Sequence, residues 1–537
     1  MKETRLFHHI LSASAERRPD SAALSSAGVS WTYEEVQLEA LRFSAALKVL
    51  GLRRFGRVAV YLDKKLETVT SMFGACAAGG IFVPVNPILK PHQVAHILQD
   101  CGVTVLVTSR ARLATLSGML GQCSSIRHVV LADASSEEVE SEPTDGPPVH
   151  SFAELTDLPP SGESSTIDSD VAAILYTSGS TGHPKGVVLS HRNLVVGAGS
   201  VAQYLKNDEE DVLLAALPLS FDAGLSQITT AFRVGARVVL HNYLLAKDVV
   251  KTVAEEGVTG ITAVPPMWAQ LAELPWPDAA VEPVRYWANT GGRMPRSVLE
   301  RLRGRLPKAD VYLMYGLTEA FRATYLPPAM VDDRPDSIGR AIPNAEVMVL
   351  REDGTPCTPG ETGELVQRGA LVALGYWNDP ERTAERFRPL PAESSARPPG
   401  VVTEELAVFS GDLVRADDDG FLYFVSRKDE MLKTSGYRVS PTEVEEVLHS
   451  SGVIAECAAF GIPHATMGQL IGVVVKPRSI DNFDTEHLFA HCRQMMPKYM
   501  VPSRIEIVED DLPRNQNGKI DRKAISLRYA ATSGESG

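Results

Sequence analysis

The stretch that decides the fold is Tyr176-Thr-Ser-Gly-Ser-Thr-Gly-His-Pro-Lys-Gly186, a run of glycines and hydroxyl side chains with a single lysine. Residues 171–176, which lead into it, form a short apolar run typical of a buried strand. Residues 187–189 predict a second strand, and residues 192–201 the beginning of a helix. The glycine-rich segment is therefore expected to be a loop held between regular elements.

The composition of this loop suits a polyphosphate. Gly179 and Gly182 allow the backbone to turn its N–H groups inward and form a concave anion site. Lys185 adds a positive charge, and hydroxyl donors come from Ser178, Ser180 and Thr181. The loop is not a Walker A motif, because Gly179 is not followed by Gly-Lys-Ser/Thr at the required offset. Taken alone, it is also compatible with a flexible surface loop.

The composition is that of an ordinary soluble chain with an acidic balance. A chain of 537 residues is too long for one hydrophobic core, so two or more domains are expected. The formal net charge of -14 argues against nucleic acid or an anionic membrane as the main partner. The 6 cysteines form no CxxC motif, and no signal peptide or long apolar segment is visible. These features predict a reduced, cytoplasmic location.

The secondary-structure pattern changes along the chain. Residues 8–130 alternate helical patterns with short β-rich runs, which predicts a mostly parallel α/β sheet. Residues 133–170 are rich in acid, Ser and Pro and are expected to form a solvated linker. From Ala345 the chain becomes β-rich, and residues 430–527 are long enough for a small α+β domain. Several strands before Ala345 run into Gly or Pro turns, which predicts a shared crevice at their carboxyl ends.

Read together, the residues of the 176–186 loop resemble the phosphate loop of the adenylate-forming superfamily, which contains acyl-CoA synthetases, luciferases and the adenylation domains of peptide synthetases. The resemblance extends over almost the whole chain. It implies an α/β fold: a large N-terminal domain of mostly parallel sheets with flanking helices and a β-rich subdomain, followed by a small mobile α+β C-terminal domain. We expect the adenylation core in residues 1–428, the mobile domain in 429–527 and a flexible tail in 528–537.

A second motif, Tyr315-Gly-Leu-Thr-Glu319, follows an apolar strand. In the family pattern its tyrosine stacks on adenine, while Thr318 and Glu319 serve the Mg·ATP complex. The assignment is physically reasonable, because an aromatic face binds a purine and a carboxylate holds Mg²⁺ through oxygen. In isolation the motif is equally compatible with a solvated glycine turn. The resemblance assigns ATP binding to Thr177, Ser178, Gly179, Ser180, Thr181, Gly182, Gly291, Gly292, Tyr315 and Gly316.

Further motifs resemble the ribose site and the hinge between the domains. Asp412 resembles the aspartate that binds both ribose hydroxyls, and Arg427 resembles the arginine that also reaches the ribose. Asp429 then falls on the hinge, where backbone rotation turns the C-terminal domain. Lys433 and Gly436, just past the hinge, would lie on the face used for the thiol half-reaction.

The segment Pro513-Arg-Asn-Gln-Asn-Gly-Lys519 resembles the terminal motif of the family, in which Lys519 bridges the substrate carboxylate and the α-phosphate. Negative charge grows on the phosphorus during adenylation, so a fixed ammonium group stabilises the transition state more than the ground state. Alone, Lys519 would be interpreted as a surface lysine in a turn. The expected catalytic residues are Lys519, Glu319, Thr318 and Lys185, with Glu319 also the Mg²⁺ ligand.

The resemblance implies a two-step reaction. A carboxylate attacks the α-phosphate of ATP to give an acyl adenylate and pyrophosphate, and the small domain then rotates so that a thiol can attack. The expected cofactors are ATP and Mg²⁺, with a phosphopantetheine thiol on a carrier protein or on CoA as co-substrate. No carrier-domain attachment motif follows Lys519, so the enzyme is expected to be freestanding and to have a separate acyl or peptidyl carrier protein as partner.

The substrate class depends mainly on Pro218-Leu-Ser-Phe-Asp222. Many acyl-CoA synthetases have histidine at the position of Phe221, whereas amino-acid adenylation domains have Phe-Asp and pair the aspartate with the substrate ammonium. A carboxylate in an apolar pocket is costly unless a cation is present, which favours an amino-acid substrate. Arg322 is expected to be structural and solvent-facing rather than to bind a second carboxylate. The expected acid-pocket residues are Phe221, Asp222, Ala223, Ala263, Ala288, Thr290, Met314 and Ala323.

Two subgroups of the family are matched equally well by Leu89-Lys-Pro91 and Phe321-Arg-Ala-Thr-Tyr-Leu-Pro-Pro328. One comprises freestanding ligases that load prolyl groups on carrier proteins, and the other comprises AMP-forming acyl-CoA ligases associated with exopolysaccharide (exosortase) export systems. The sequence therefore favours adenylation of a small amino acid, with a proline-like candidate, and keeps an acyl-CoA synthetase that uses free CoA as the alternative. A non-catalytic scaffold disagrees with the presence of Lys185, Glu319 and Lys519.

Overall fold

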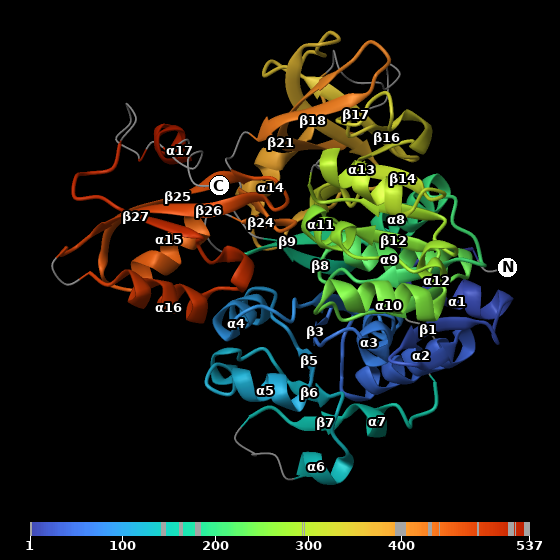
Figure 1. The fold of residues 1–537 in the computed structure, drawn as a ribbon. Coiled ribbons are helices and arrows are strands. Elements are labelled where there is room, and N and C mark those ends of the chain that lie inside the picture. The colour runs from blue at the N-terminus through green and yellow to red at the C-terminus, as the bar shows by residue number, and fades with distance from the viewer. Residues whose placement is uncertain are drawn as a thin grey trace.

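A computed structural model describes most of the chain, and its N-terminal part contains two large sheets (Figure 1). The described residues are 3–140, 146–160, 165–177, 184–292, 294, 296–391, 404–427, 432–439, 441–480, 483–513, 520 and 522–530.

The first sheet has eight strands and carries the glycine-rich loop. In spatial order its strands are β19 (Gly375–Tyr376), β9 (Lys185–Ser190), β8 (Val171–Thr177), β4 (Ile81–Pro84), β3 (Arg57–Tyr61), β5 (Val105–Thr108), β6 (His128–Leu131) and β7 (Val149–Ser151). Strands β3 to β8 pair in parallel, whereas β8 and β9 are antiparallel, with Tyr176 opposite Gly186. The two strands predicted on either side of the loop are thus confirmed.

The second sheet has nine strands and ends in the turns that the sequence singled out. In spatial order its strands are β16 (Arg340–Ala341), β15 (Thr324–Leu326), β14 (Asp310–Tyr315), β13 (Tyr286–Asn289), β12 (Gly260–Ala263), β10 (Val212–Ala215), β11 (Arg237–Leu240), β1 (Ala22–Ser26) and β2 (Val29–Thr32). Strands β10 to β14 pair in parallel, so their carboxyl ends share one edge.

Helices cover both sheets and join their cores. In the N-terminal domain they are α1 (Phe7–Arg17), α2 (Tyr33–Val49), α3 (Leu66–Ala77), α4 (Pro91–Asp100), α5 (Arg110–Leu116), α6 (Ser136–Glu140), α7 (Phe152–Leu155), α8 (His191–Tyr204), α9 (Asp222–Val234), α10 (Ala246–Glu256), α11 (Pro265–Glu273), α12 (Asp278–Val281) and α13 (Arg296–Arg305). The ring of Phe73 in α3 lies 4.4 Å from that of Phe7 and 5.5 Å from that of Phe232, centroid to centroid. Because α3 follows a strand of the first sheet and α9 a strand of the second, these contacts join the sheets through one core.

A β-rich subdomain follows, in agreement with the change of pattern at Ala345. Its antiparallel sheet contains β17 (Ala345–Leu350), β18 (Thr362–Gly369), β21 (Leu406–Ala416), β20 (Phe387–Pro389) and β22 (Leu422–Arg427), with the short helix α14 (Pro380–Arg386).

The C-terminal domain is small and has a core of its own. It consists of β24 (Tyr437–Val439), β23 (Leu432–Thr434), β26 (Gly468–Pro477), β25 (Ile454–His464), β27 (Arg504–Ile507), α15 (Pro441–Ser450), α16 (Thr485–Met495) and α17 (Arg522–Ala530). Val444, Val473 and Leu488 are fully buried in that core. Figure 1 shows this domain, in orange and red, beside α4, where Gln93 Nε2 donates a hydrogen bond to Glu443 at 3.4 Å. The predicted fold class is confirmed, whereas the junction at residues 428 and 429 lies outside the described residues.

The predicted linker over residues 133–170 is partly wrong. It contains α6, β7 and α7, and β7 extends the first sheet by pairing with β6, where His150 lies opposite Val130. A strand of three residues is too short to produce a readable alternation of apolar and polar side chains. Among the described residues, no helix has both the length and the apolar character needed to cross a bilayer.

Candidate active site

A cavity of about 1160 Å³ opens at the carboxyl ends of β12, β13 and β14. Its wall includes Pro265 after β12, Gly291 and Gly292 after β13, and Gly316 after β14. This is the crevice that the pattern of strands running into Gly or Pro turns predicts.

Two residues predicted for adenine and ribose contact each other, and one of them, Tyr315, lies on the wall of this cavity. The Tyr315 hydroxyl donates a hydrogen bond to the Asp412 carboxylate, which is fully buried. Asp412 in β21 lies opposite Arg427 in β22, of which only the backbone is described. The tyrosine was expected to present its ring to adenine. In the structure its hydroxyl also forms a hydrogen bond with the aspartate expected to bind the ribose. These residues therefore form one unit although they are 97 positions apart in sequence.

Lys185 and Glu319, from two different motifs, meet in a buried polar cluster. Lys185 Nζ lies 3.1 Å from Glu319 Oε1 and 2.8 Å from the Tyr376 hydroxyl, which in turn donates to Glu319 Oε1 at 2.7 Å. The sequence analysis missed Tyr376. Strand β19 brings it there by pairing with β9, where Tyr376 lies opposite Val187. No local pattern predicts this pairing, because β19 has only two residues.

Glu319 and Thr318 suit a magnesium ion that is held chiefly by nucleotide phosphates. Mg²⁺ in such sites takes one or two carboxylates and fills its remaining positions with water and phosphate oxygen. Thr318 supplies a hydroxyl on the cavity wall, and Glu319, the next residue, supplies one carboxylate. Among the described residues, no group of three or more His, Cys, Asp or Glu side chains could hold a metal by itself. The residues present therefore fit an ion that arrives with the nucleotide.

The acid end of the cavity contains an internal ion pair. Asp222, the first residue of α9, accepts from Arg322 Nη1 at 3.1 Å and from the Thr318 hydroxyl at 3.3 Å. Arg322 Nη1 also lies 3.4 Å from the Thr290 hydroxyl. Arg322 is only 2% exposed, so the expectation that it faces solvent is wrong. The cation that the sequence analysis expected from a substrate is supplied by the chain itself.

The remaining acid-pocket predictions divide into two groups. Phe221, Asp222, Ala223, Thr290 and Met314 line the cavity. Three predicted lining residues belong instead to the hydrophobic core, are fully buried and are not on the wall of this cavity: Ala263, Ala288 and Ala323. Small residues at matched positions can lie behind a wall as easily as on it.

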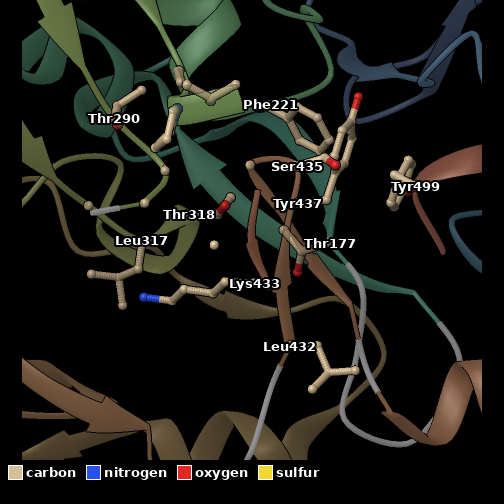
Figure 2. Close-up of a pocket in the computed structure, with 18 of the residues that line it drawn as sticks. Thr177, Phe221, Thr290, Leu317, Thr318, Leu432, Lys433, Ser435, Tyr437 and Tyr499 are labelled. Carbon is tan, nitrogen blue, oxygen red and sulfur yellow. The ribbon is translucent and has the colours of Figure 1, made fainter. Parts of the chain in front are cut away.

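The hairpin β23–β24 of the C-terminal domain enters the same cavity. Lys433 and Gly436 line it, and a Cβ atom added to Gly436 would lie 2.8 Å from Val264 Cβ. Gly436 also has φ +80°, so both its conformation and its surroundings favour glycine. Figure 2 shows Leu432, Lys433, Ser435 and Tyr437 around the same space as Thr318. The hairpin thus completes the wall of the acid and nucleotide crevice.

Two tyrosines that the sequence analysis missed connect this hairpin to the acid pocket. The Tyr437 ring stacks on the Tyr499 ring with centroids 3.6 Å apart and meets the Phe221 ring edge-on at 5.3 Å. Figure 2 shows the Phe221 and Tyr437 rings next to each other. Burial raises the pKa of Tyr437 to about 12. The pair is therefore a neutral aromatic wall at neutral pH.

Some predicted site residues lie outside the described residues: Ser178, Gly179, Ser180, Thr181, Gly182, Asp429 and Lys519. Thr177, which precedes the loop at the end of β8, lines the cavity. Strand β8 therefore ends at the edge of the crevice, and the predicted roles of the loop and of Lys519 stay predictions.

Family models match the chain in two places. The AMP-binding enzyme model matches residues 11–377, and the model of the AMP-binding enzyme C-terminal domain matches residues 443–519. The chain belongs to the AMP-binding enzyme family. It is an adenylate-forming enzyme, similar to acyl-CoA ligases, of the AMP-forming acid–thiol ligase class.

Relatives of this AMP-binding enzyme align over nearly its whole length. It is 27% identical over 543 residues to the long-chain-fatty-acid–CoA ligase of Bacillus subtilis (strain 168), covering 96% of this chain and 93% of the relative. It is 29% identical over 548 residues to a syringomycin synthase of Pseudomonas syringae pv. syringae, covering 99% of this chain and 83% of that protein. The structure of o-succinylbenzoate CoA synthetase from Bacillus subtilis, with a product analogue, has a TM-score of 0.79 at 26% identity and covers 97% and 98% of the two chains.

Proposed function

We propose that this AMP-binding enzyme adenylates a small carboxylic acid with ATP, releases pyrophosphate, and passes the acyl group to a phosphopantetheine thiol. The observation that carries the proposal is the single cavity itself. It is lined by Tyr315 at the nucleotide end, by Asp222 and Met314 at the acid end, and by the hairpin that bears Lys433. Both half-reactions can therefore use one acyl position without moving the acid.

The nucleotide end supplies charge where adenylation needs it. A bound Mg²⁺ ion would neutralise part of the phosphate charge. Lys185 provides an ammonium group at the exit of the phosphate loop, and Glu319, oriented by the Tyr376 hydroxyl, provides the carboxylate for the ion. Because the Glu319 carboxylate is only 9% exposed, interactions at this end are less screened than on the surface. We assign to Lys519 the role of stabilising the charge that grows on the α-phosphate.

The acid class is proposed from two observations that point in different directions. The Asp222 side chain is 16% exposed and lines the cavity, which supports an amino acid, with proline as candidate, and a separate carrier protein as acceptor. The pairing of Asp222 with Arg322 supports an acid without an ammonium group, with CoA as acceptor. An ammonium group would have to share Asp222 with a cation that is already there.

The experiment that tests the proposal is ATP–pyrophosphate exchange with proline, other amino acids and short acyl acids, followed by thiol transfer. Exchange with an amino acid, and loading of a holo carrier protein but not of CoA, would support the amino-acid form. Exchange with acyl acids and formation of an acyl-CoA would support the CoA form. Failure of all acids, with ATP binding intact, would overturn the proposed function.

A further inference from the structure

Behind the acid end of the main cavity lies a second, much smaller cavity of about 20 Å³. Three residues line both cavities: Ala223, Met314 and Arg322. The inner cavity also has polar walls, which include Ser226, Gln227 and Thr230 of α9. A volume of this size holds about one water molecule, so the inner cavity by itself takes no organic ligand.

Arg322 is the large polar side chain among the three residues that separate the two cavities. Its guanidinium is fixed on one side by Asp222, at 3.1 Å, and by Thr290, at 3.4 Å. Its side chain is 3% exposed, so it is a packed part of the wall rather than a group that extends into solvent. Arg322 Nε has no hydrogen-bond partner among the described residues.

The backbone before Arg322 is held in an uncommon conformation that places this side chain. Phe321 has φ +57° and ψ -50°, a region that side-chain-bearing residues seldom adopt and that costs energy. Its ring is fully buried against Gly197 of α8, where an added Cβ atom would lie 2.6 Å from the ring. The packing of Phe321 therefore sets the direction in which the chain leaves at Arg322.

We propose that Arg322, held by Asp222 and Thr290, is the floor of the acid pocket and restricts the enzyme to short acids. The inference rests on the proposed function, because it assigns the substrate size of the same site. An acid enters past Ala223 and Met314 and meets the guanidinium where the inner cavity begins. A longer acid would have to displace Arg322 and break its ion pair with the half-buried Asp222. The ion pair thus makes the floor costly to move.

The test is binding of hydrolysis-resistant acyl-sulfamoyl adenosines with butanoyl and octanoyl chains, measured by calorimetry on the full chain. The wild-type protein is expected to bind the butanoyl compound at least about tenfold more tightly than the octanoyl compound, because the floor excludes the longer chain. Arg322→Ala should join the two cavities and reduce or reverse this ratio by about tenfold or more. An unchanged ratio in a folded Arg322→Ala protein would overturn the proposal.

Two further variants distinguish the space that Arg322 occupies from its charge, and a lost chain-length preference from a failure to fold. Arg322→Met keeps a long side chain without charge and is expected to retain the wild-type preference for the short compound. If the Met variant accepts octanoyl as the Ala variant does, Arg322 does not act by occupying the space. The double variant Asp222→Asn/Arg322→Ala removes the carboxylate charge that Arg322→Ala leaves without the guanidinium. If the single variant fails to fold, the relative affinity of the double variant for the butanoyl and octanoyl compounds tests the assignment of the floor.

This readout is independent of turnover. If pyrophosphate exchange fails with every acid while the compounds bind with the expected preference, the proposed function is wrong and the assignment of the floor stands. If exchange with short acids succeeds and the chain-length ratio does not respond to Arg322→Ala, the function stands and the assignment of the floor is wrong.

Discussion

The two ends of the cavity differ in the contacts that their charged side chains make. At the proposed nucleotide end, Lys185, Glu319 and Tyr376 form a cluster of mutual contacts, and Glu319 directly follows Thr318 on the cavity wall. At the acid end, Asp222 and Arg322 form an ion pair with each other, and the guanidinium is packed into the wall. Each end contains one cation and one carboxylate, and the two pairs differ in the groups that they contact. We propose that the charges of the first end act on the nucleotide, whereas those of the second shape the pocket.

The sharpest way to test the chemical role of the nucleotide end is to remove the ammonium group proposed for it. Lys519→Ala is expected to slow adenylation by about 10²–10³-fold, about 3–4 kcal/mol of transition-state stabilisation. Transfer of a preformed acyl adenylate to the thiol should continue, because Lys519 has no proposed role in that step. Pyrophosphate exchange measures the first step and single-turnover thioester formation the second. Equal loss of both would contradict the assignment.

At the acid end the largest expected effect is on stability. Asp222→Ala leaves the Arg322 guanidinium buried without its carboxylate and is expected to lower the free energy of unfolding by about 3 kcal/mol. Urea denaturation measures the change. The double variant Asp222→Ala/Arg322→Met removes both charges and should recover most of the loss. If the double variant is less stable than the single one, the ion pair is not the reason for the cost.

A smaller effect is expected from the residue that the sequence analysis missed at the nucleotide end. Tyr376→Phe removes the hydroxyl that contacts both Lys185 and Glu319 and should reduce the adenylation rate about tenfold, about 1.4 kcal/mol. Because Tyr376 donates to Glu319, the proposed Mg²⁺ ligand, the Mg²⁺ concentration for half-maximal rate should rise, while the KM for the acid stays unchanged. A rise in the acid KM alone would contradict this role.

The smallest effect concerns Lys64, whose ammonium group donates to the carbonyls of Ala216, at 2.9 Å, and Leu217, just before the acid-site segment 218–222. Burial lowers its pKa to about 8. Above pH 8 the folded protein releases this proton while the unfolded chain keeps it up to about pH 10.5. The cost of burying the charge is thereby relieved, and stability relative to Lys64→Met should rise with pH, by about 1 kcal/mol at pH 9.

Thermal denaturation of both proteins between pH 7 and about pH 9.5 checks this prediction, and the variant cancels the titration of other groups. A constant difference between the two proteins across that range would show that Lys64 keeps an ordinary pKa. A difference that falls with rising pH would contradict the sign.

The residues expected at the nucleotide end could be named from the sequence because they belong to short motifs. Tyr315, Thr318 and Glu319 lie within five positions of one another, at the end of a strand with a clear apolar pattern. Tyr376 was not predictable, because it reaches Lys185 only through the pairing of the two-residue strand β19 with β9. Three alanines expected on the acid wall, including Ala288, lie in the hydrophobic core instead, because a matched position in the sequence does not state how deeply a residue is buried.

The sequence alone determined the α/β class, because apolar periodicity and turn residues report local structure directly. The order of the domains and the motifs of the nucleotide end were expected from the resemblance to the adenylate-forming superfamily. Only the tertiary structure decided that Asp222 has a cation from the chain itself. The two residues are 100 positions apart, and their contact depends on the order of the parallel strands and on the backbone of Phe321 at φ +57°. Charge pairing across a fold is a property of distances in space, and no local pattern of residues encodes those distances.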